Sequence, residues 1–378
     1  TYPLSWLGRW LPAVSTAVII LVALTVTLGL TAWQARRREN QPAMVLGWGW
    51  WAAASLLIIL PLPVTYLLHG PRLLYLSSIG LAFVWAVLLD PWQARSRLAR
   101  FALIGWILIV LLSNWWFVRG RLADYERLTS PLETVEAVMV DRPAGEGALL
   151  VNLPQWLAPE RNSYPTGVEF VAMLGDYLFV EELLAENLGT DRPAQALKVA
   201  ELLSDPGYGY AIHEQTTDQA IVADWAPGGS QLFVVRYAPE RLATEHLGSF
   251  LPPDGGPPKP LAAMGLYQLL SAVAESCNGG VHVVTTWQWP AGDAPSPSTS
   301  LFVQLMDGAG QLIAQADGPP LGLRPDLVAL PEGWRVVDRR SIPVEADYSG
   351  QQVLFGVYDF TSGERFSAQD SQGRPLPD

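Results

Sequence analysis

Long apolar segments separated by short polar ones make up the amino-terminal third of the chain. Each segment is long enough to cross a bilayer core of about 30 Å as a helix. The segments run over residues 11–33, 43–60, 71–89 and 101–117. The pattern predicts four membrane-spanning helices in a first domain that covers residues 1–122.

Between residues 123 and 251, short apolar runs alternate with segments of helical spacing. A polar helix is predicted to continue to Met139. Further helices are predicted at 168–188 and 193–203, and strands at 148–153, 220–225 and 231–237. Strands mixed with helices indicate a small α/β domain.

The next boundary is marked by prolines and glycines. Five prolines and two glycines stand among residues 252–260, which predicts a linker over 252–262. From 263 to 378 the pattern is purely β, with strands predicted at 281–287, 301–306, 311–315, 335–344 and 353–358. The predicted fold is therefore multi-domain: a four-span transmembrane helical bundle, a small α/β domain and a carboxyl-terminal β-sandwich.

Charge divides the chain at the same place as hydrophobicity. Residues 1–120 hold nine Lys or Arg and two acids, whereas the remainder holds fifteen and thirty-four, so the net charges are +7 and −19. The acidic part repels phosphates, because nucleic-acid binding depends on Lys and Arg that neutralise them. Membrane lipid is the predicted partner of the first part, and nucleic acid is excluded.

Arginines in the short polar segments indicate the orientation in the membrane, because basic residues are retained on the cytoplasmic side. Three follow the first apolar segment at 36–38, and three lie between the third and fourth segments at positions 95, 97 and 100. The loop at 61–70 and all residues after Phe117 are then outside. Thr1 is not an initiator methionine, so the chain is interpreted as a fragment whose upstream spans are missing.

The most specific local signal is the segment 69–80, at the outer mouth of the third apolar segment. It resembles the Arg-x-x-Tyr-x-Pro-Ser-x-Gly segment of multi-span glycosyltransferases of the GT-C type, which use a polyprenyl-phosphate sugar. The residues that match are Arg72, Tyr75, Ser78 and Gly80. The chain differs at position 71, where it has Pro and the family often has Glu, and at position 77, where it has Ser in place of Pro.

A cation at this position suits the phosphate of a lipid-linked sugar. Arg72 offers a planar fork of donors to phosphate oxygens, and the interface avoids the roughly 2.5–3.5 kcal/mol that a mid-bilayer position costs. His69 and Tyr75 add donors, so these three residues are the candidates for binding the carrier phosphate. The alternative is that Arg72 reaches the lipid headgroups and Tyr75 belongs to an interfacial aromatic belt.

A second resemblance covers residues 280–378. The runs Leu301–Asp307, Asp317–Pro320, Val337–Asp338, Gly356–Asp359 and Gly363–Arg365 are similar to the extracytoplasmic β-sandwich of many bacterial relatives of these transferases. The resemblance implies the bacterial cytoplasmic membrane as the location, with the soluble carboxyl-terminal part outside. It also implies a catalytic base upstream of Thr1, so no catalytic residue is assigned here.

Other candidate residues have ordinary structural explanations. Four aspartates, at positions 307, 317, 338 and 359, have the oxygen ligands of a calcium site, but aspartate beside glycine is typical of turns. The tryptophans at 287, 289 and 334 suit a sugar-stacking surface or, more simply, a hydrophobic core. The four histidines have no metal-ligand spacing, and neither a phosphate-binding glycine loop nor a serine-nucleophile motif is present. No metal site and no cofactor are predicted.

Two functions remain open. The first is the carboxyl-terminal portion of an integral-membrane glycosyltransferase, which transfers a sugar from a polyprenyl-phosphate carrier to an extracytoplasmic glycan or protein acceptor and is inactive as a fragment. The second is a non-catalytic, membrane-anchored binding protein in which helices tether the outer domains. The donor sugar, the acceptor and the oligomeric state have no signal in the sequence.

Overall fold

The computed structural model describes residues 13–61, 75–95, 97–159, 170–173, 180–189, 192–199, 209–212, 229–238, 242–253, 259–277, 279–290, 296–323, 330–344 and 352–376. These residues belong to two compact units. We call residues up to Glu126, together with Leu157–Val171, the helical unit. Arg127–Trp156 together with Ala172–Asp378 form the sheet unit.

The described residues of the helical unit form four long helices. They are α2 (Ala13–Gln34), α3 (Gln41–Ile59), α5 (Tyr75–Arg95) and the first part of α6 (Arg97–Met139). Helices α3 and α5 pack through glycine, because a Cβ added to Gly80 would lie 2.5 Å from the carbonyl oxygen of Gly47. Such contacts let two helix backbones approach closely, which is common where helices pack in lipid.

The prediction of a four-span bundle is wrong. Within the described residues, α3 is the one helix that is long and apolar enough to cross a membrane. The apolar part of α5, Tyr75–Leu89, is fifteen residues long and rises about 22 Å, less than the bilayer core. The fourth segment is part of the 43-residue helix α6, which continues through charged residues such as Arg119, Arg121 and Asp124. Apolar composition alone did not show where these helices end.

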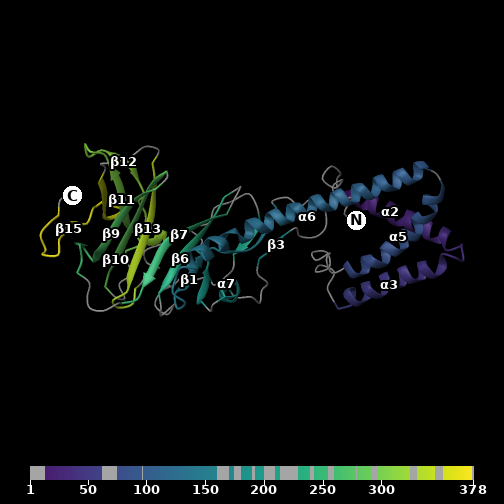
Figure 1. The fold of residues 1–378 in the computed structure, drawn as a ribbon, viewed down its shortest axis with the longest axis horizontal. Coiled ribbons are helices and arrows are strands. Elements are labelled where there is room, and N and C mark those ends of the chain that lie inside the picture. Colours follow the sequence, from purple (N-terminus) through teal and green to yellow (C-terminus); the bar gives the residue numbers. More distant parts are fainter. Residues whose placement is uncertain are drawn as a thin grey trace. The chain divides into compact units, whose positions relative to one another are not determined.

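The sheet unit is built on one nine-stranded sheet, in the order β15-β8-β9-β10-β13-β7-β6-β1-β4 (Figure 1). Its strands are β1 (Gly147–Val151), β4 (Ala194–Leu197), β6 (Ser230–Tyr237), β7 (Leu242–Leu251), β8 (Ala262–Met264), β9 (Tyr267–Cys277), β10 (Gly280–Gln288), β13 (Arg335–Pro343) and β15 (Ala368–Gln369). Strand β1 pairs in parallel with β4 and β6, and the other pairs are antiparallel. The sheet is therefore mixed.

A second, three-stranded sheet has the order β12-β11-β14. It contains β11 (Thr299–Met306), β12 (Leu312–Gln315) and β14 (Gln352–Asp359). Between the two sheets, the largest core cluster joins residues from β1, β6, β9, β10 and β11, including Leu149, Leu232, Trp287 and Leu301. The remaining elements are the short strands β2 (Pro154–Ala158), β3 (Val171–Ala172) and β5 (Gly209–Ile212), helix α7 (Val180–Leu188) and the 3-10 turn η4 (Pro320–Gly322).

Two separate outer domains were predicted, and this part of the fold class is also wrong. Strands from both predicted domains join the nine-stranded sheet, through the ladder between β7 and β13. Residues 254–258 of the predicted linker lie outside the described residues. A segment rich in proline and glycine does not prevent the strands on either side of it from pairing. Its composition was therefore a poor guide to whether the two predicted domains fold separately.

Some elements were also assigned the wrong type. Strand β4 lies in the segment 193–203 that was predicted as a helix, and β3 and α7 share the predicted helix 168–188. Strand β4 is paired with the fully buried strand β1, so tertiary pairing outweighs the local helical spacing. The strands predicted at 148–153 and 231–237 are confirmed as β1 and β6, whereas the segment 220–225 lies outside the described residues.

The carboxyl end of α6 belongs to the sheet unit and has one buried face. Leu128, Leu132, Val135 and Met139 are four, three and four residues apart, and all are buried. This is the spacing of one apolar stripe on a helix. The side chain of Asn187 on α7 also donates a hydrogen bond to Glu136 on α6.

Strands β7 and β13 meet over a short stretch and then diverge. Their ladder pairs Arg335–Asp338 with Gly248–Leu251. At Leu247 the register of β7 against β6 shifts, and Gly248 has a φ of +149°. A β-bulge bends the strand that carries it, so β7 follows β6 beyond this point while β13 stays paired with β10.

A buried ion pair stands at the point of divergence. Asp338, which is 2% exposed, accepts a hydrogen bond from Nε of Arg340 at 2.6 Å and another from the backbone N–H of Leu321 at 2.7 Å. The remaining donors of Arg340 reach the carbonyl oxygens of four residues: Leu301, Ala316, Gly318 and Pro319. The pair therefore ties β13 to β11 and to the loop before η4, with its buried charges satisfied.

We expect Gly248→Ala to destabilise the sheet unit strongly. An added Cβ would lie 1.8 Å from the carbonyl oxygen of Val337, at a backbone conformation that other residues rarely adopt. The free energy of unfolding should fall by about 3 kcal/mol or more, measured by chemical denaturation. Gly308→Ala is the control, since its Cβ would meet no atom within 4 Å. Equal stability of the two variants would contradict this account of the divergence.

Candidate functional site

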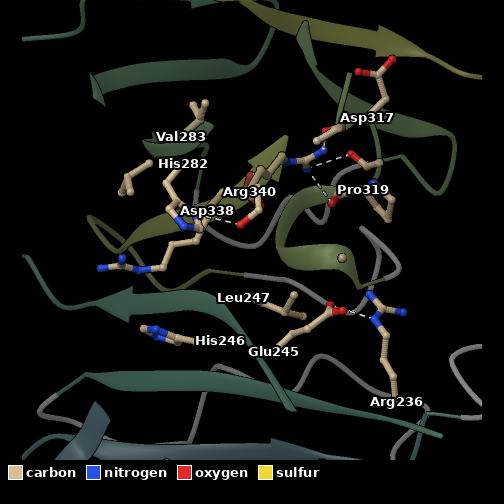
Figure 2. Close-up of a pocket in the computed structure, with 16 residues that line it drawn as sticks. Arg236, Glu245, His246, Leu247, His282, Val283, Asp317, Pro319, Asp338 and Arg340 are labelled. Atoms are coloured by element: carbon tan, nitrogen blue, oxygen red, sulfur yellow. Dashed lines mark hydrogen bonds and ion pairs between the residues drawn. The ribbon is translucent and has the colours of Figure 1, made fainter. Parts of the chain in front are cut away.

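The divergence of β7 and β13 opens a groove of about 690 Å³ in the sheet unit. On one side it is lined by Glu245, His246 and Leu247 of β7, and on the other by residues 338–341 of β13. Figure 2 shows these two groups on opposite sides of the opening, with Pro319 of the loop before η4 also at its edge. The groove therefore occupies the place where a strand is missing between β7 and β13.

The three carboxylates that line the groove are already engaged. Glu245 pairs with Arg236 at 2.7 Å, and Figure 2 shows these two side chains facing each other. Asp338 is bound to Arg340, and Asp317 accepts the backbone N–H of Val303 at 3.1 Å. The acids of the groove are thus neutralised or hydrogen bonded within the fold.

Arg339 differs from the other arginines of the groove. Its Nε is buried and, within the described part of the chain, has no hydrogen-bond partner. Burial lowers the pKa of Arg339, and the positive charge of Arg142 lowers it further. Arg339 and Arg142 thus repel each other, and no described carboxylate is bound to the guanidinium of Arg339. The part of the chain that contains both arginines nevertheless has a strongly negative net charge. The free charge of the groove is positive.

His246 is held neutral beside this charge. Its Nε2 lies 2.7 Å from Oε1 of Gln231 and 3.1 Å from the carbonyl oxygen of Gly248. Both neighbours accept, because the amide nitrogen of Gln231 donates to Glu146, so we assign the proton to Nε2. Burial lowers the pKa of His246 to about 4, and Arg339 and Arg142 add to the effect. The ring also stacks on Phe233 at 4.9 Å.

A serine and a histidine also meet at the groove. The hydroxyl of Ser341 lies 2.8 Å from Nδ1 of His282 on the neighbouring strand β10. This is the one hydrogen bond of the His282 ring among the described residues, so no acid orients it from the other nitrogen. The pair lacks the third member that a nucleophilic triad requires.

The residues predicted to bind a carrier phosphate belong to the helical unit. His69 and Arg72 lie outside the described residues. Tyr75 is the first residue of α5 and is 79% exposed, and its carbonyl oxygen accepts the hydroxyl of Ser78 at 2.6 Å. The structure thus describes three of the four matched residues: Tyr75 and Ser78 are joined by this hydrogen bond, and Gly80 packs against α3.

Several alternatives left open by the sequence are decided by the structure. Asp307 accepts the backbone N–H groups of Ala309 and Gln311, and Asp359 accepts those of two residues in the turn that follows it, so both are turn residues. Trp287 and Trp289 are 1% and 4% exposed and belong to the core. Among the described residues, no three His, Cys, Asp or Glu side chains are grouped to hold a metal ion.

Sequence reasoning missed the residues of the groove. Arg339 and Arg340 are neighbours on one strand, so their side chains point to opposite faces and have different environments. The pair of arginines in an acidic region was a visible signal, but the residues that surround them come from distant segments.

Comparisons of the chain with protein-family models, curated proteins and solved structures find no match.

Acidification should destabilise the sheet unit through His246. The unfolded chain takes up this proton near pH 6.5, whereas the folded protein resists until about pH 4, so the free energy of unfolding falls between these values. We expect a loss of about 1 to 2 kcal/mol after allowance for solvent screening of the half-buried ring.

The measurement compares wild type with His246→Gln by denaturation at several pH values. The difference in stability between the two proteins should shrink as the pH falls from 7 to 4, because glutamine does not titrate. A difference that stays constant over this range would show that His246 is not held neutral by the fold.

Proposed function

We propose that this chain is a membrane-anchored binding protein whose sheet unit holds its ligand in the groove between β7 and β13. The observation that carries the proposal concerns the described residues of the groove: Nε of Arg339 has no partner among them, and their three carboxylates are all engaged. A charge held without a partner costs folding free energy. A ligand that pairs with this charge removes the unfavourable free energy of the unpaired group, and this difference favours binding.

Helix α3 is the proposed anchor. Only 22% of its most apolar stretch is buried, whereas the core helix of a water-soluble unit is mostly buried. Large apolar side chains such as Val45, Leu57 and Leu60 are more than 70% exposed. An apolar surface of this size is stable in lipid and unstable in water. The acidic sheet unit would lie outside the bilayer, and the arginines at 36–38 favour the extracytoplasmic side for it.

Binding is favoured over catalysis at the groove. A histidine with a pKa of about 4 is a weak base at neutral pH. The pair of Ser341 and His282 has no orienting acid among the described residues, and the groove carboxylates are held in ion pairs or hydrogen bonds. The groove thus offers recognition groups, and we assign it no chemical step.

The binding function is tested with the full chain in lipid nanodiscs. Hydrogen exchange is measured with and without a panel of probes: short peptides, inorganic phosphate and an oligosaccharide that carries carboxylates. A bound probe should slow exchange at Glu245–Leu247 and 339–341, because these parts of the two strands line the groove.

Two variants sharpen the experiment. Ser341→Trp should abolish the protection, because an indole fills the groove at an exposed position. Exchange of Gln41–Ile59 for an unrelated membrane helix should leave the protection unchanged. The function is rejected if no probe protects these strands, or if the protection survives Ser341→Trp.

A second candidate is the glycosyltransferase function implied by the resemblance of residues 69–80. The observation that favours it is the exposed Tyr75 at the beginning of α5, where its side chain is free to meet a lipid-linked phosphate. The role of Arg72 in this function is unchanged from the sequence prediction: it would bind the carrier phosphate with a planar fork of donors.

Arg72→Ala in the full-length protein should weaken use of a polyprenyl-phosphate sugar. We expect KM for the carrier to rise about tenfold or more, since a charge-assisted hydrogen bond is lost. Arg38→Ala is the matched control, because it removes an arginine that lies outside the motif. Transfer that proceeds with unchanged KM and kcat in the Arg72 variant would remove this arginine from the mechanism.

A further inference from the structure

The two strands that border the groove each have one free edge. From Leu242 to His246, β7 is paired with β6, and from Arg339 to Pro343, β13 is paired with β10. The ladder between β7 and β13 ends at Asp338 and Gly248. In a strand, alternate residues direct their N–H and C=O groups to opposite sides. Within the described residues, each strand therefore presents backbone donors and acceptors to the groove without a ladder to satisfy them.

We propose that the groove binds an extended peptide segment with an acidic side chain. The segment pairs as an added strand with the free edges of β7 and β13, and its carboxylate binds the guanidinium of Arg339. This inference rests on the proposed binding function and specifies its ligand. The occupant is a polypeptide, because backbone edges recognise backbone.

The dimensions of the groove suit such a segment. The unpaired part of β13 is five residues long, which corresponds to about 17 Å of extended chain. The volume of about 690 Å³ lies within the range of sites that enclose a ligand of this size. An open strand edge inside a sheet is otherwise a liability, because it invites pairing with other chains.

The charges specify an acidic side chain. Arg236 and Arg340 are already paired with Glu245 and Asp338, so among the described residues that line the groove Arg339 is the arginine with an unsatisfied donor. The repulsion between Arg339 and Arg142 would be relieved by a carboxylate bound to Arg339. Because Nε of Arg339 has no partner to lose in the part of the chain that the structure describes, its replacement should affect binding and leave the fold intact.

Other ligand classes use less of the site. Sugars are usually held by stacking on aromatic rings, and none of the described residues that line the groove is Trp, Tyr or Phe. A free phosphate would engage Arg339 and leave the two strand edges unpaired. Only an extended peptide satisfies both the backbone edges and the free charge.

The experiment measures the affinity of labelled hexapeptides for the full chain in nanodiscs by fluorescence anisotropy. The peptides alternate Val and Thr and carry one Glu at each position in turn. Each has two matched forms, one with Gln in place of Glu and one N-methylated on alternate residues, which removes the N–H donors from one edge so that the peptide cannot pair with both strands. The best Glu peptide should bind at least about tenfold tighter than either form.

Variants of the protein identify the contact. Arg339→Gln should remove the difference between the Glu and Gln peptides, with a Tm that is unchanged or raised. Arg374→Gln is the control, because this exposed arginine pairs with Asp370 outside the groove, and it should keep the difference. A double-mutant cycle of peptide and protein isolates the pairing between Glu and Arg339.

Three results would overturn the inference: equal binding of Glu and Gln peptides, equal binding of the N-methylated form, or a Glu preference that survives Arg339→Gln. If phosphate or the acidic oligosaccharide protects the groove strands while no peptide binds, the peptide ligand is wrong and the binding function stands. If no probe protects these strands, both proposals fail.

Discussion

The sheet unit depends on a ladder of four residue pairs between β7 and β13. It is the connection within the nine-stranded sheet between the part with parallel strands and the antiparallel part. Gly248 makes this contact feasible, because any side chain there would collide with the carbonyl oxygen of Val337. The same glycine and the adjacent β-bulge end the ladder, so the constraint that joins the two parts also opens the groove between them.

The charged residues of β13 at the groove are of two kinds, paired and unpaired. Asp338 and Arg340 are buried and mutually satisfied, and they hold β13 to the loop before η4. Arg339, the residue between them in sequence, faces the other way and lacks such a partner among the described residues. Burial lowers the pKa of His246 and, with a further contribution from that charge, keeps its ring neutral. One strand thus supplies both a structural ion pair and a cation that is available to a ligand.

Function is correspondingly assigned to two places in the chain. We propose the groove as a recognition site, whereas the segment 69–80 resembles a carrier-phosphate segment and remains a prediction from the sequence. The two are compatible in one protein, because a membrane transferase also needs to hold its acceptor. If the groove binds a peptide segment, that segment is a natural candidate for a protein acceptor or for a partner that recruits one.

The sequence by itself determined features that depend on neighbouring residues. These include the apolar helix α3, the strands β1 and β6, the turn roles of Asp307 and Asp359, and the division of charge between the two parts of the chain. Each follows from local periodicity, turn chemistry or composition, which a single sequence carries. Its candidates for the carrier phosphate lie outside the groove, and Asp317 and Asp338, which do line the groove, were interpreted as turn residues.

Tertiary structure alone decided which strands join and where they separate. Strand β4 is a strand because β1 pairs with it, and the predicted outer domains merge because β7 meets β13. The pKa values of His246 and Arg339 are lowered first by burial and then by Arg142, which is distant from both in sequence. Long-range strand pairing and burial exist only in the folded protein. Local sequence patterns therefore predicted several helices and strands but could not predict which residues meet in the groove.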